Sequence, residues 1–317
     1  MNICRTLAIT SAVCAFASFA VARAAHAQGT AYACESNRSL YTINLATGAK
    51  TSIGVVGSNV SVPAALTYDC VTGITYTSNT FTNVGVFKQL YTLNMATGAA
   101  TAVGPYGDLA IFTHTLQINT RTGHLYAISH HNSGLYFVNK NTGAATLIGL
   151  TGFTGTFPFA SMGYDSTNNV MYAVNAATDS LYRVNLLTGA ATLVGPLNGP
   201  INCGDITYNA DNQIMYMVDN DNDILYTINL TTGQATPIGP TGVGNLIGFT
   251  YNSNTPASCP ARCPVNYNSS GTVSVQDIFD FLGGWFAADP RADFDNAGGI
   301  SVQDIFAFLS GWFAGCP

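Results

Sequence analysis

The chain has 317 residues and a formal net charge of −6, with 10 Lys and Arg residues against 16 Asp and Glu residues. Charged residues make up 8% of the sequence and hydrophobic residues 47%, whereas about 25% of the residues in ordinary globular proteins are charged. So few basic residues exclude a phosphate-binding face, and we expect no nucleic-acid partner. The hydrophobicity excludes an intrinsically disordered chain.

Residues 1–27 have the organisation of a secretory signal peptide. Arg5 precedes an apolar run from Leu7 to Val21, and Ala25-His26-Ala27 forms a small-x-small cleavage site before Gln28. A membrane anchor would need about 20 apolar residues, and we expect no membrane span in the rest of the chain. The sequence therefore predicts a secreted, extracellular protein, which could be associated with a cell surface.

Cleavage would leave an even number of cysteines in an exported protein, which suggests disulfides. Six cysteines allow fifteen pairings, so the sequence alone does not assign them. These residues are Cys34, Cys70, Cys203, Cys259, Cys263 and Cys316.

One phrase recurs five times after the signal peptide, as in LYTINLATGAKTSIG and LYRVNLLTGAATLVG. Each copy alternates apolar and polar residues, breaks at Thr-Gly and alternates again, which predicts a β-hairpin with glycine at the turn. The copies begin at Leu40, Leu90, Leu135, Leu181 and Leu225.

A second hairpin pattern, such as ITYNADNQIMYMV, precedes the phrase in units two to five, so that each unit holds about four strands. Four strands in every ~40–50 residues are typical of a β-propeller blade. Unit one lacks its first strand, and a spare copy, LIGFTYN, stands at residues 246–252. We therefore predict an all-β, five-bladed β-propeller over residues 28–255, closed by its C-terminal strand.

Tyrosines occupy one repeated position in all five units. Packing of stacked blades requires the same residue in every blade, whereas a single binding site does not, so we interpret these tyrosines as core rather than sugar-stacking platforms. They are Tyr32, Tyr76, Tyr126, Tyr172 and Tyr216.

Residues 256–262 form a Pro-, Ser- and Cys-containing linker, and residues 263–317 contain a second kind of repeat. SVQDIFDFLGGWFA begins at Ser274 and SVQDIFAFLSGWFA at Ser301. Apolar residues at i, i+3, i+4 and i+7 predict two similar amphipathic helices that face each other. They are Ile278, Phe281, Leu282 and Trp285 in the first copy and Ile305, Phe308, Leu309 and Trp312 in the second.

A twelve-residue segment with calcium-loop spacing precedes each helix and ends in its first turn, with Asp rather than Glu at position 12 and Gly at position 6. In the second loop the predicted ligands are Asp293, Asp295, Gly299 through its carbonyl, Ser301 and Asp304. In the first loop they are Asn266, Asn268, Ser270, Thr272 and Asp277.

The paired loop–helix units and the Gly-Cys-Pro terminus resemble a dockerin domain of the Gly-Cys type found at the C-termini of secreted bacterial proteins. The resemblance covers residues 263–317 and implies a small α-helical domain with two calcium loops. It further implies Ca²⁺-dependent folding and docking onto a cohesin-like scaffold receptor, often in polysaccharide-degrading systems. In that family, loop positions 10 and 11 help to select the receptor. Here they are Val275-Gln276 and Val302-Gln303, identical in the two halves, which implies two binding orientations.

The loops depart from the family pattern in their ligands. Loop one carries a single carboxylate, Asp277, and loop two has Ala297 at position 5. Because calcium affinity follows ligand charge, loop two should bind Ca²⁺ better than loop one. The alternative is a calcium-free helical pair held by a Cys263–Cys316 disulfide.

A second apolar stripe on the two predicted helices could form a docking surface or the remainder of a small core, and the sequence leaves both open. It comprises Phe279, Phe286, Phe306 and Phe313.

Five-bladed propellers include glycoside hydrolases with paired carboxylates, but acidic residues are few here. Asp69 and Asp165 stand at hairpin turns where other units have Asn, which indicates turn chemistry. Asp205 and Glu35 have no such equivalents and are weak catalytic candidates, because no recognisable pairing fixes their separation.

Two further groups could bind a metal, and we favour a structural interpretation of both. The alternate carboxylates of residues 219–223 occur at a strand-to-strand turn. Adjacent His130 and His131, near His114 and His124, would point to opposite faces of a strand and could not share a zinc ion.

We therefore expect a secreted propeller that binds a ligand or partner, such as a polysaccharide or a protein, carried to a surface assembly by a Ca²⁺-dependent dockerin-like tag. The alternatives are a polysaccharide-acting glycoside hydrolase or lyase of a cellulosome-like system, and a purely structural surface protein. Propeller loops determine function, and these loops do not name the ligand.

Overall fold

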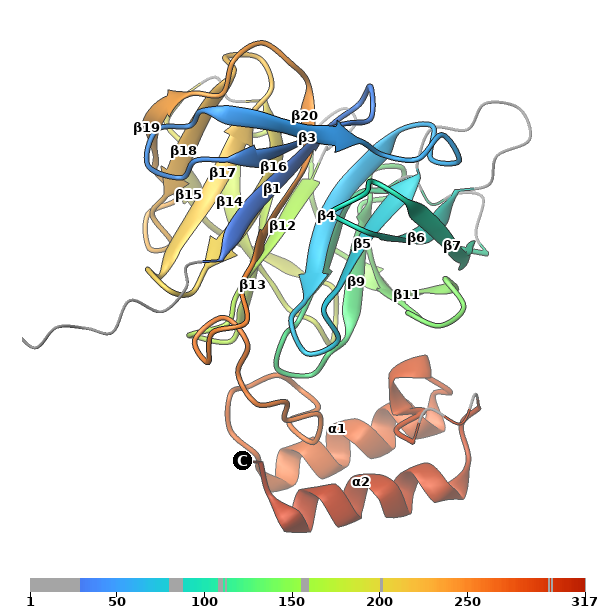
Figure 1. Ribbon diagram of the computed structural model, residues 1–317. Coiled ribbons are helices and arrows are strands. Elements are labelled where there is room, and N and C mark those ends of the chain that lie inside the picture. Colours follow the sequence, from blue (N-terminus) through green and yellow to red (C-terminus); the bar gives the residue numbers. More distant parts are fainter. Residues whose placement is uncertain are drawn as a thin grey trace, which may run out of the picture.

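The computed structural model describes residues 29–79, 88–107, 111, 113–154, 160–199, 202–295, 297 and 299–316. The expected signal peptide, residues 1–27, lies outside the described residues. The described chain is a mainly-β, five-bladed propeller followed by two helices (Figure 1).

Each blade of the propeller is an antiparallel sheet of four strands. The first sheet contains β20 (Leu246–Asn252), β1 (Thr30–Glu35), β2 (Ser39–Ile43) and β3 (Lys50–Val55). The second contains β4 (Pro63–Asp69), β5 (Ile74–Asn79), β6 (Gln89–Leu93) and β7 (Ala100–Pro105). The third contains β8 (Thr113–Ile118), β9 (Leu125–Ser129), β10 (Gly134–Val138) and β11 (Ala145–Leu150). The fourth contains β12 (Ala160–Asp165), β13 (Val170–Asn175), β14 (Ser180–Val184) and β15 (Ala191–Pro196). The fifth contains β16 (Cys203–Asn209), β17 (Ile214–Asp219), β18 (Ile224–Ile228) and β19 (Ala235–Pro240).

The ring closes as the strand pattern predicts. β20 pairs antiparallel with β1, with Ala31 opposite Tyr251 and Ala33 opposite Phe249. The strand that follows the fifth blade therefore completes the first one. This closure joins the two ends of the propeller chain and leaves no open blade at the seam.

The repeated phrase explains how neighbouring blades meet. Its Thr-Gly pair turns each outer hairpin, and Gly48 has φ +83°, a conformation that favours glycine. A Cβ atom added to Gly48 would collide with the backbone carbonyl of Gly239, the last glycine of the fifth phrase. The turn glycine and the last glycine of the repeated phrase thus form contacts between successive blades, here across the seam between blades five and one.

Hydroxyl side chains connect the innermost strands. The Thr67 Oγ1 atom accepts a hydrogen bond from Ile118 N at 3.1 Å, and Thr207 Oγ1 accepts one from Tyr251 N at 3.0 Å. In each case the side chain of one blade satisfies a backbone N–H of a strand in another blade. Uncharged side chains therefore connect the blades at the centre of the ring, which accounts for part of the low charge of the chain.

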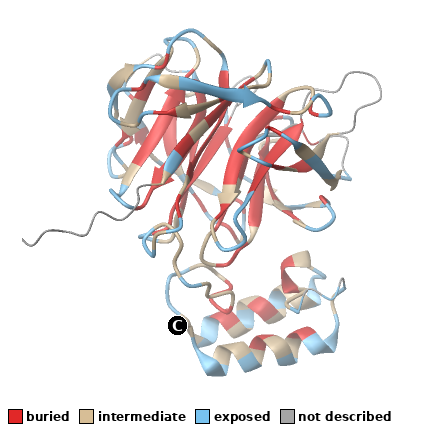
Figure 2. Ribbon diagram, viewed as in Figure 1, coloured by how far each residue is buried: buried red, intermediate tan, exposed pale blue. Residues whose placement is uncertain are grey.

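Buried residues line the inner strands of each blade, whereas the strand at the outer edge of each blade is mostly exposed (Figure 2). Four of the five repeated tyrosines are core, as predicted: Tyr76, Tyr126, Tyr172 and Tyr216 are at most 4% exposed. Tyr32 is half-buried and packs against the cluster between blades one and two.

The C-terminal tail, residues 263–316, contains α1 (Val275–Phe286), the short 3₁₀ helix η1 (Pro290–Ala292) and α2 (Val302–Ala314). Phe281 and Phe308 are fully buried and stack with ring centroids 4.1 Å apart, so the predicted helical faces do meet. A disulfide joins Cys263 to Cys316. Neither helix in the described part of the chain has the length and apolar character needed to cross a membrane.

Candidate functional site

The second tail loop gathers three carboxylates. Ligand oxygens of Asp293, Asp295 and Asp304 all lie within 4.8 Å of one another. Asp304 is fully buried at the start of α2, where its Oδ2 atom accepts a hydrogen bond from Ser301 N at 2.7 Å. Burial alone would raise the pKa of Asp304, but backbone hydrogen bonds, first from Ser301 and then from Asp295 and Phe294, lower it. Three carboxylate donors this close together suit a hard divalent cation such as Ca²⁺.

The other two predicted ligands of this loop have different surroundings. Ser301 is the N-cap of α2, and its hydroxyl oxygen accepts a hydrogen bond from Gln303 N at 3.1 Å. Gly299 is exposed. Gly298, the predicted turn glycine of this loop, lies outside the described residues.

The first tail loop satisfies its polar groups internally. Asn266 and Asn268 each use Oδ1 to accept a hydrogen bond from Ser270 N, at 3.0 and 2.9 Å, and Ser270 Oγ donates to the Thr272 carbonyl at 3.0 Å. Asp277 is buried and accepts from Ser274 N at 2.8 Å, as Asp304 does in loop two. With one carboxylate and amides already bonded to the backbone, loop one fits a cation less well than loop two.

The second apolar stripe is on the surface and is not part of the tail core. Phe279 and Phe306 are 63% and 62% exposed, and Phe286 and Phe313 are both 78% exposed. Equivalent residues of α1 and α2 therefore have matching exposure. Large apolar side chains exposed on both helices are a feature of interaction sites.

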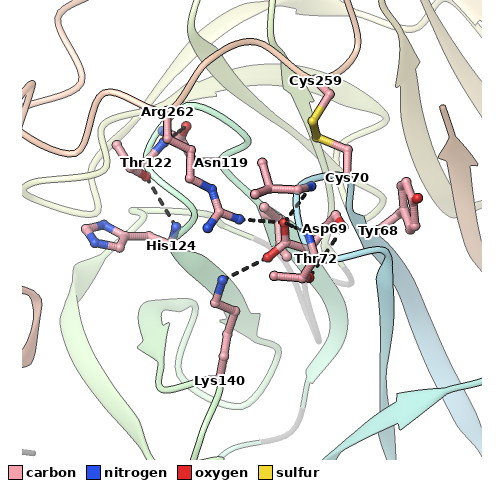
Figure 3. Close-up of polar contacts among 12 residues, drawn as sticks. Tyr68, Asp69, Cys70, Thr72, Asn119, Thr122, His124, Lys140, Cys259 and Arg262 are labelled. Atoms are coloured by element: carbon pink, nitrogen blue, oxygen red, sulfur yellow. Dashed lines mark hydrogen bonds and ion pairs between the residues drawn. A yellow bond between two sulfur atoms is a disulfide. The ribbon is translucent and has the colours of Figure 1, made fainter. Parts of the chain in front are cut away.

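The tail is fastened to one end of the propeller, beside the turns that follow the innermost strands. Figure 3 shows Asp69 between Lys140 and Arg262, next to the Cys70–Cys259 disulfide. The Asp69 carboxylate lies 2.9 Å from Lys140 Nζ and 2.5 Å from Arg262 Nη2. Burial alone would raise the pKa of Asp69, but hydrogen bonds and charge from Lys140 and Arg262 lower it.

A second attachment comes from the tail itself. Arg291 of η1 is buried, forms an ion pair with Asp289 and donates from Nη1 to the Leu186 carbonyl of the propeller at 2.6 Å. Leu187 packs against the apolar core of the tail. The linker and the tail thus contact the propeller through covalent, ionic and apolar interactions.

The two weak catalytic candidates make structural contacts. Asp205 is 1% exposed, and its carboxylate accepts hydrogen bonds from Ile206 N and Phe249 N, both at 2.9 Å. Burial raises the pKa of Asp205 well above its usual value, although these backbone hydrogen bonds oppose the shift. Glu35 is 4% exposed and forms an ion pair with Lys50 at 2.6 Å.

The turn interpretation of the other acidic residues agrees with the contacts. Asp69 Oδ1 accepts a hydrogen bond from Val71 N at 3.2 Å, and Asp165 Oδ1 accepts one from Thr167 N at 3.0 Å. In the run 219–223, Asp219 Oδ1 accepts a hydrogen bond from Asp221 N at 3.0 Å. Of the adjacent histidines, His130 is 3% exposed and its Nε2 atom accepts a hydrogen bond from Ala160 N at 3.3 Å.

A cavity of about 250 Å³ opens at the other end of the propeller, where the innermost strands begin. It is lined by residues from the first, third, fourth and fifth blades and their connections, among them Ser36, Ser161, Asn202, Asn220, Asn245 and Ile247. The repeat pattern itself does not predict this cavity. Its residues lie where the units differ from one another, and such departures from a repeat are the signal that marks a site used once.

A family model described as "Repeat of unknown function (DUF6923)" matches residues 82–255, which is more than half of the chain. The chain belongs to this repeat family. None of the curated proteins compared with the chain matches it.

Solved structures resemble the chain at low sequence identity. A chain of a nidogen/laminin complex is 11% identical with a TM-score of 0.50, over 71% of this chain and 99% of that one. A protein of unknown function from Bacteroides thetaiotaomicron is 16% identical with a TM-score of 0.49, and the match covers 66% of this chain. An auxiliary nutrient binding protein from Bacteroides ovatus is 14% identical with a TM-score of 0.45, over 64% of this chain. The chain spans 55% and 54% of the lengths of these two Bacteroides proteins.

Proposed function

We propose that this protein is an exported binding protein, in which the propeller is a platform for an extracellular ligand or partner and the tail is a Ca²⁺-dependent docking tag. The carboxylate cluster of Asp293, Asp295 and Asp304 carries the proposal, because three acidic groups within 4.8 Å favour a bound cation. Two disulfides support export, since such bonds persist in oxidising compartments.

Calcium is the cation that the second loop suits. Asp293, Asp295 and Asp304 would supply carboxylate oxygens, Gly299 a carbonyl and Ser301 a hydroxyl or a water-mediated contact. The first loop, with Asn266, Asn268, Ser270, Thr272 and Asp277, would bind more weakly or remain a hydrogen-bonded turn. Bound Ca²⁺ would neutralise the carboxylates and hold the second loop against the start of α2.

The exposed Phe279, Phe286, Phe306 and Phe313 would then form the docking surface for a cohesin-like receptor on a scaffold or cell surface. Their matched exposure on two similar helices favours a receptor that accepts the tag in two orientations related by half a turn. Attachment through the tail leaves the cavity at the opposite end of the propeller facing outward.

Calorimetry with Ca²⁺ on the mature chain tests the tag, using the same substitution in each loop. Asp304→Asn should abolish the stronger binding event, because it removes one of the three clustered carboxylates. Asp277→Asn, at the same position of loop one, should leave that event within about twofold of its original affinity. Equal effects of the two substitutions would contradict the assignment of the site to loop two.

Docking is tested by capture from the cell-envelope fraction of the source organism. The receptor should bind the mature chain in Ca²⁺ and be released by a chelator. Replacement of Phe306 and Phe313 by Ser should reduce capture only partly, because α1 presents an equivalent face, and replacement of all four phenylalanines should abolish it. Capture that survives both the chelator and the fourfold replacement would refute the docking function.

A further inference from the structure

The cavity at the outward end of the propeller is a single concave site in a molecule built of repeats. Its volume is about 250 Å³, smaller than the ~300–1,000 Å³ typical of pockets for drug-sized ligands. It therefore suits one small cyclic group, such as a single residue of a chain ligand, rather than an extended segment.

The described lining of this cavity carries no Asp, Glu, Lys or Arg side chain. The amides of Asn202, Asn220 and Asn245 and the hydroxyls of Ser36 and Ser161 supply hydrogen-bonding groups. Some of their donors are in use, since Asn245 Nδ2 donates to Ser36 Oγ at 3.2 Å and Ser161 Oγ to the Gly204 carbonyl at 3.3 Å, which leaves acceptor positions for a ligand. Amides and hydroxyls both donate and accept hydrogen bonds.

The lining also contains His130, whose Nε2 atom accepts a hydrogen bond from Ala160 N at 3.3 Å, and Cys203, whose pKa is raised by burial so that its thiol stays neutral. Phosphates, carboxylates and metal ions favour a charged or unengaged ligand group that these side chains do not offer, so the cavity selects an uncharged polar ligand.

Asn220 offers an acceptor to such a ligand. Its Oδ1 atom is buried and makes no hydrogen bond, while its backbone N donates to the Asn202 carbonyl at 2.9 Å. A buried polar atom without a partner is costly, and a ligand hydroxyl would satisfy it.

Gly204 provides the space beside this acceptor. A Cβ atom at Gly204 would lie 2.6 Å from Asn220 Oδ1 and would also collide with the Leu246 carbonyl. A larger residue would therefore fill the cavity and separate the first and fifth blades.

Acidic side chains lie beside the lining, and they already have partners. The exposed Asp221 accepts a hydrogen bond from Asn202 Nδ2 at 3.0 Å. Asp205 follows Gly204 in β16 but is 1% exposed, and its carboxylate is already bonded to backbone N–H groups of Ile206 and Phe249. A ligand in the cavity meets Ala160 and Ile247 as apolar contacts and the amides and hydroxyls as polar ones. This combination matches a ring that has C–H faces and a rim of hydroxyl groups.

We propose that this cavity binds one uncharged sugar residue of a neutral glycan, an inference that rests on the proposed role of the propeller as a binding platform. Adjacent hydroxyls of a sugar present donor and acceptor side by side, as the amides of Asn202, Asn220 and Asn245 do. A peptide would instead be expected to add a strand to a sheet edge or lie along a groove. The compact shape of this cavity favours the sugar.

Calorimetry on the full mature chain tests the proposal with neutral gluco-, manno-, galacto- and xylo-oligosaccharides and with oligogalacturonate as the charged counterpart. We expect binding of at least one neutral set and none of oligogalacturonate. Asn220→Ala should weaken that binding about tenfold or more, which corresponds to loss of a buried hydrogen bond. Gln234→Ala, at an exposed turn at the other end of the same blade, should change nothing.

The melting temperature of Asn220→Ala and its Ca²⁺ affinity show that the variant is folded. If oligogalacturonate binds and every neutral set fails, the ligand class is wrong, whereas the role as a binding platform stands. Failure of all sugars, or unchanged affinity in Asn220→Ala, overturns the assignment of this cavity. Docking through the tail is measured in a separate experiment, so failure of sugar binding does not contradict the proposed attachment through the tail.

Discussion

Asp69 shows how one residue of a repeated turn acquires a second role. Its Oδ1 atom accepts from Val71 N, as Asn and Asp do at the equivalent turns of other blades. In this blade alone, among the described residues, the same carboxylate also pairs with Lys140 of the neighbouring blade and Arg262 of the linker. The repeat supplies the turn, and the charge connects the propeller to the tail.

Asp69→Asn should separate these two roles, because the amide keeps the turn acceptor and removes the charge. We expect the free energy of unfolding at pH 7 to fall by about 1–2 kcal/mol, between the values for surface and buried ion pairs. The folded-state pKa of Asp69 is lowered, so its stabilisation is complete above the unfolded pKa of ~3.9 and is lost as the pH falls below that value.

Urea unfolding of both proteins at several pH values measures this difference. Wild type and Asp69→Asn should differ at pH 7 and approach each other as the pH falls below ~3.9 and through the lowered folded-state pKa of Asp69, since other titrating groups are common to both. A difference that persists unchanged in acid would show that the ion pairs are not responsible.

The two tail helices hold each other's loops through tryptophan side chains. Trp285 of α1 donates from Nε1 to the Ser301 carbonyl at 2.7 Å, and Trp312 of α2 donates to the Ser274 carbonyl at 3.0 Å. Ser301 and Ser274 are the N-caps of α2 and α1 and occupy the same position in the two predicted calcium loops. The C-terminal part of each helix therefore contacts the loop that precedes the other helix.

Trp285→Phe should lower the Ca²⁺ affinity of the second loop several-fold, because the Ser301 carbonyl loses a partner worth about 1 kcal/mol. Trp312→Phe removes the equivalent bond from the first loop and serves as the matched control. Calorimetry of the mature chain should show a weaker main binding event only in Trp285→Phe. If both variants weaken it equally, the hydrogen bonds stabilise the tail as a whole and do not act on one loop.

The hairpins and helices could be predicted because each occurs more than once. Alternation around Thr-Gly predicts the outer hairpins, and the spare strand at residues 246–252 predicts the closure with β1. The pairing of Cys70 with Cys259 could not be predicted, because six cysteines can pair in many ways and the sequence does not choose among them. The exposure of Phe279 and Phe306 likewise required the packing of α1 on α2, because a helical stripe does not reveal how much of it a neighbour covers.

The cavity and the tail lie at opposite ends of the propeller. Figure 1 shows the two tail helices beside one end, and the residues that line the cavity stand at the start of the innermost strands, at the other end. The innermost strands begin at the cavity and end beside the tail, where Asn169 Nδ2 donates to the Ser269 carbonyl at 2.7 Å. Of the candidate sites, the tail loops could be located from the sequence because ligand spacing is local. The cavity could not, because blades far apart in the chain contribute single residues to it, such as Ser36 and Asn202.

The Cys70–Cys259 disulfide restricts the movement of the linker, and with it the tail, relative to the propeller. It joins the second blade to the linker across 189 residues, and Arg262 forms its ion pair with Asp69 just beyond it.

Replacing Cys70 and Cys259 by Ser should free residues 253–262 and speed their cleavage by a nonspecific protease about tenfold, while the propeller remains intact, because cleavage follows local opening. Replacing Cys263 and Cys316 by Ser is the matched control, since it removes the disulfide within the tail and leaves the linker fastened. Cleavage mapped by mass spectrometry distinguishes the two. Equal protection of the linker in both variants would mean that Arg262, Arg291 and Leu187 hold the tail to the propeller without the disulfide.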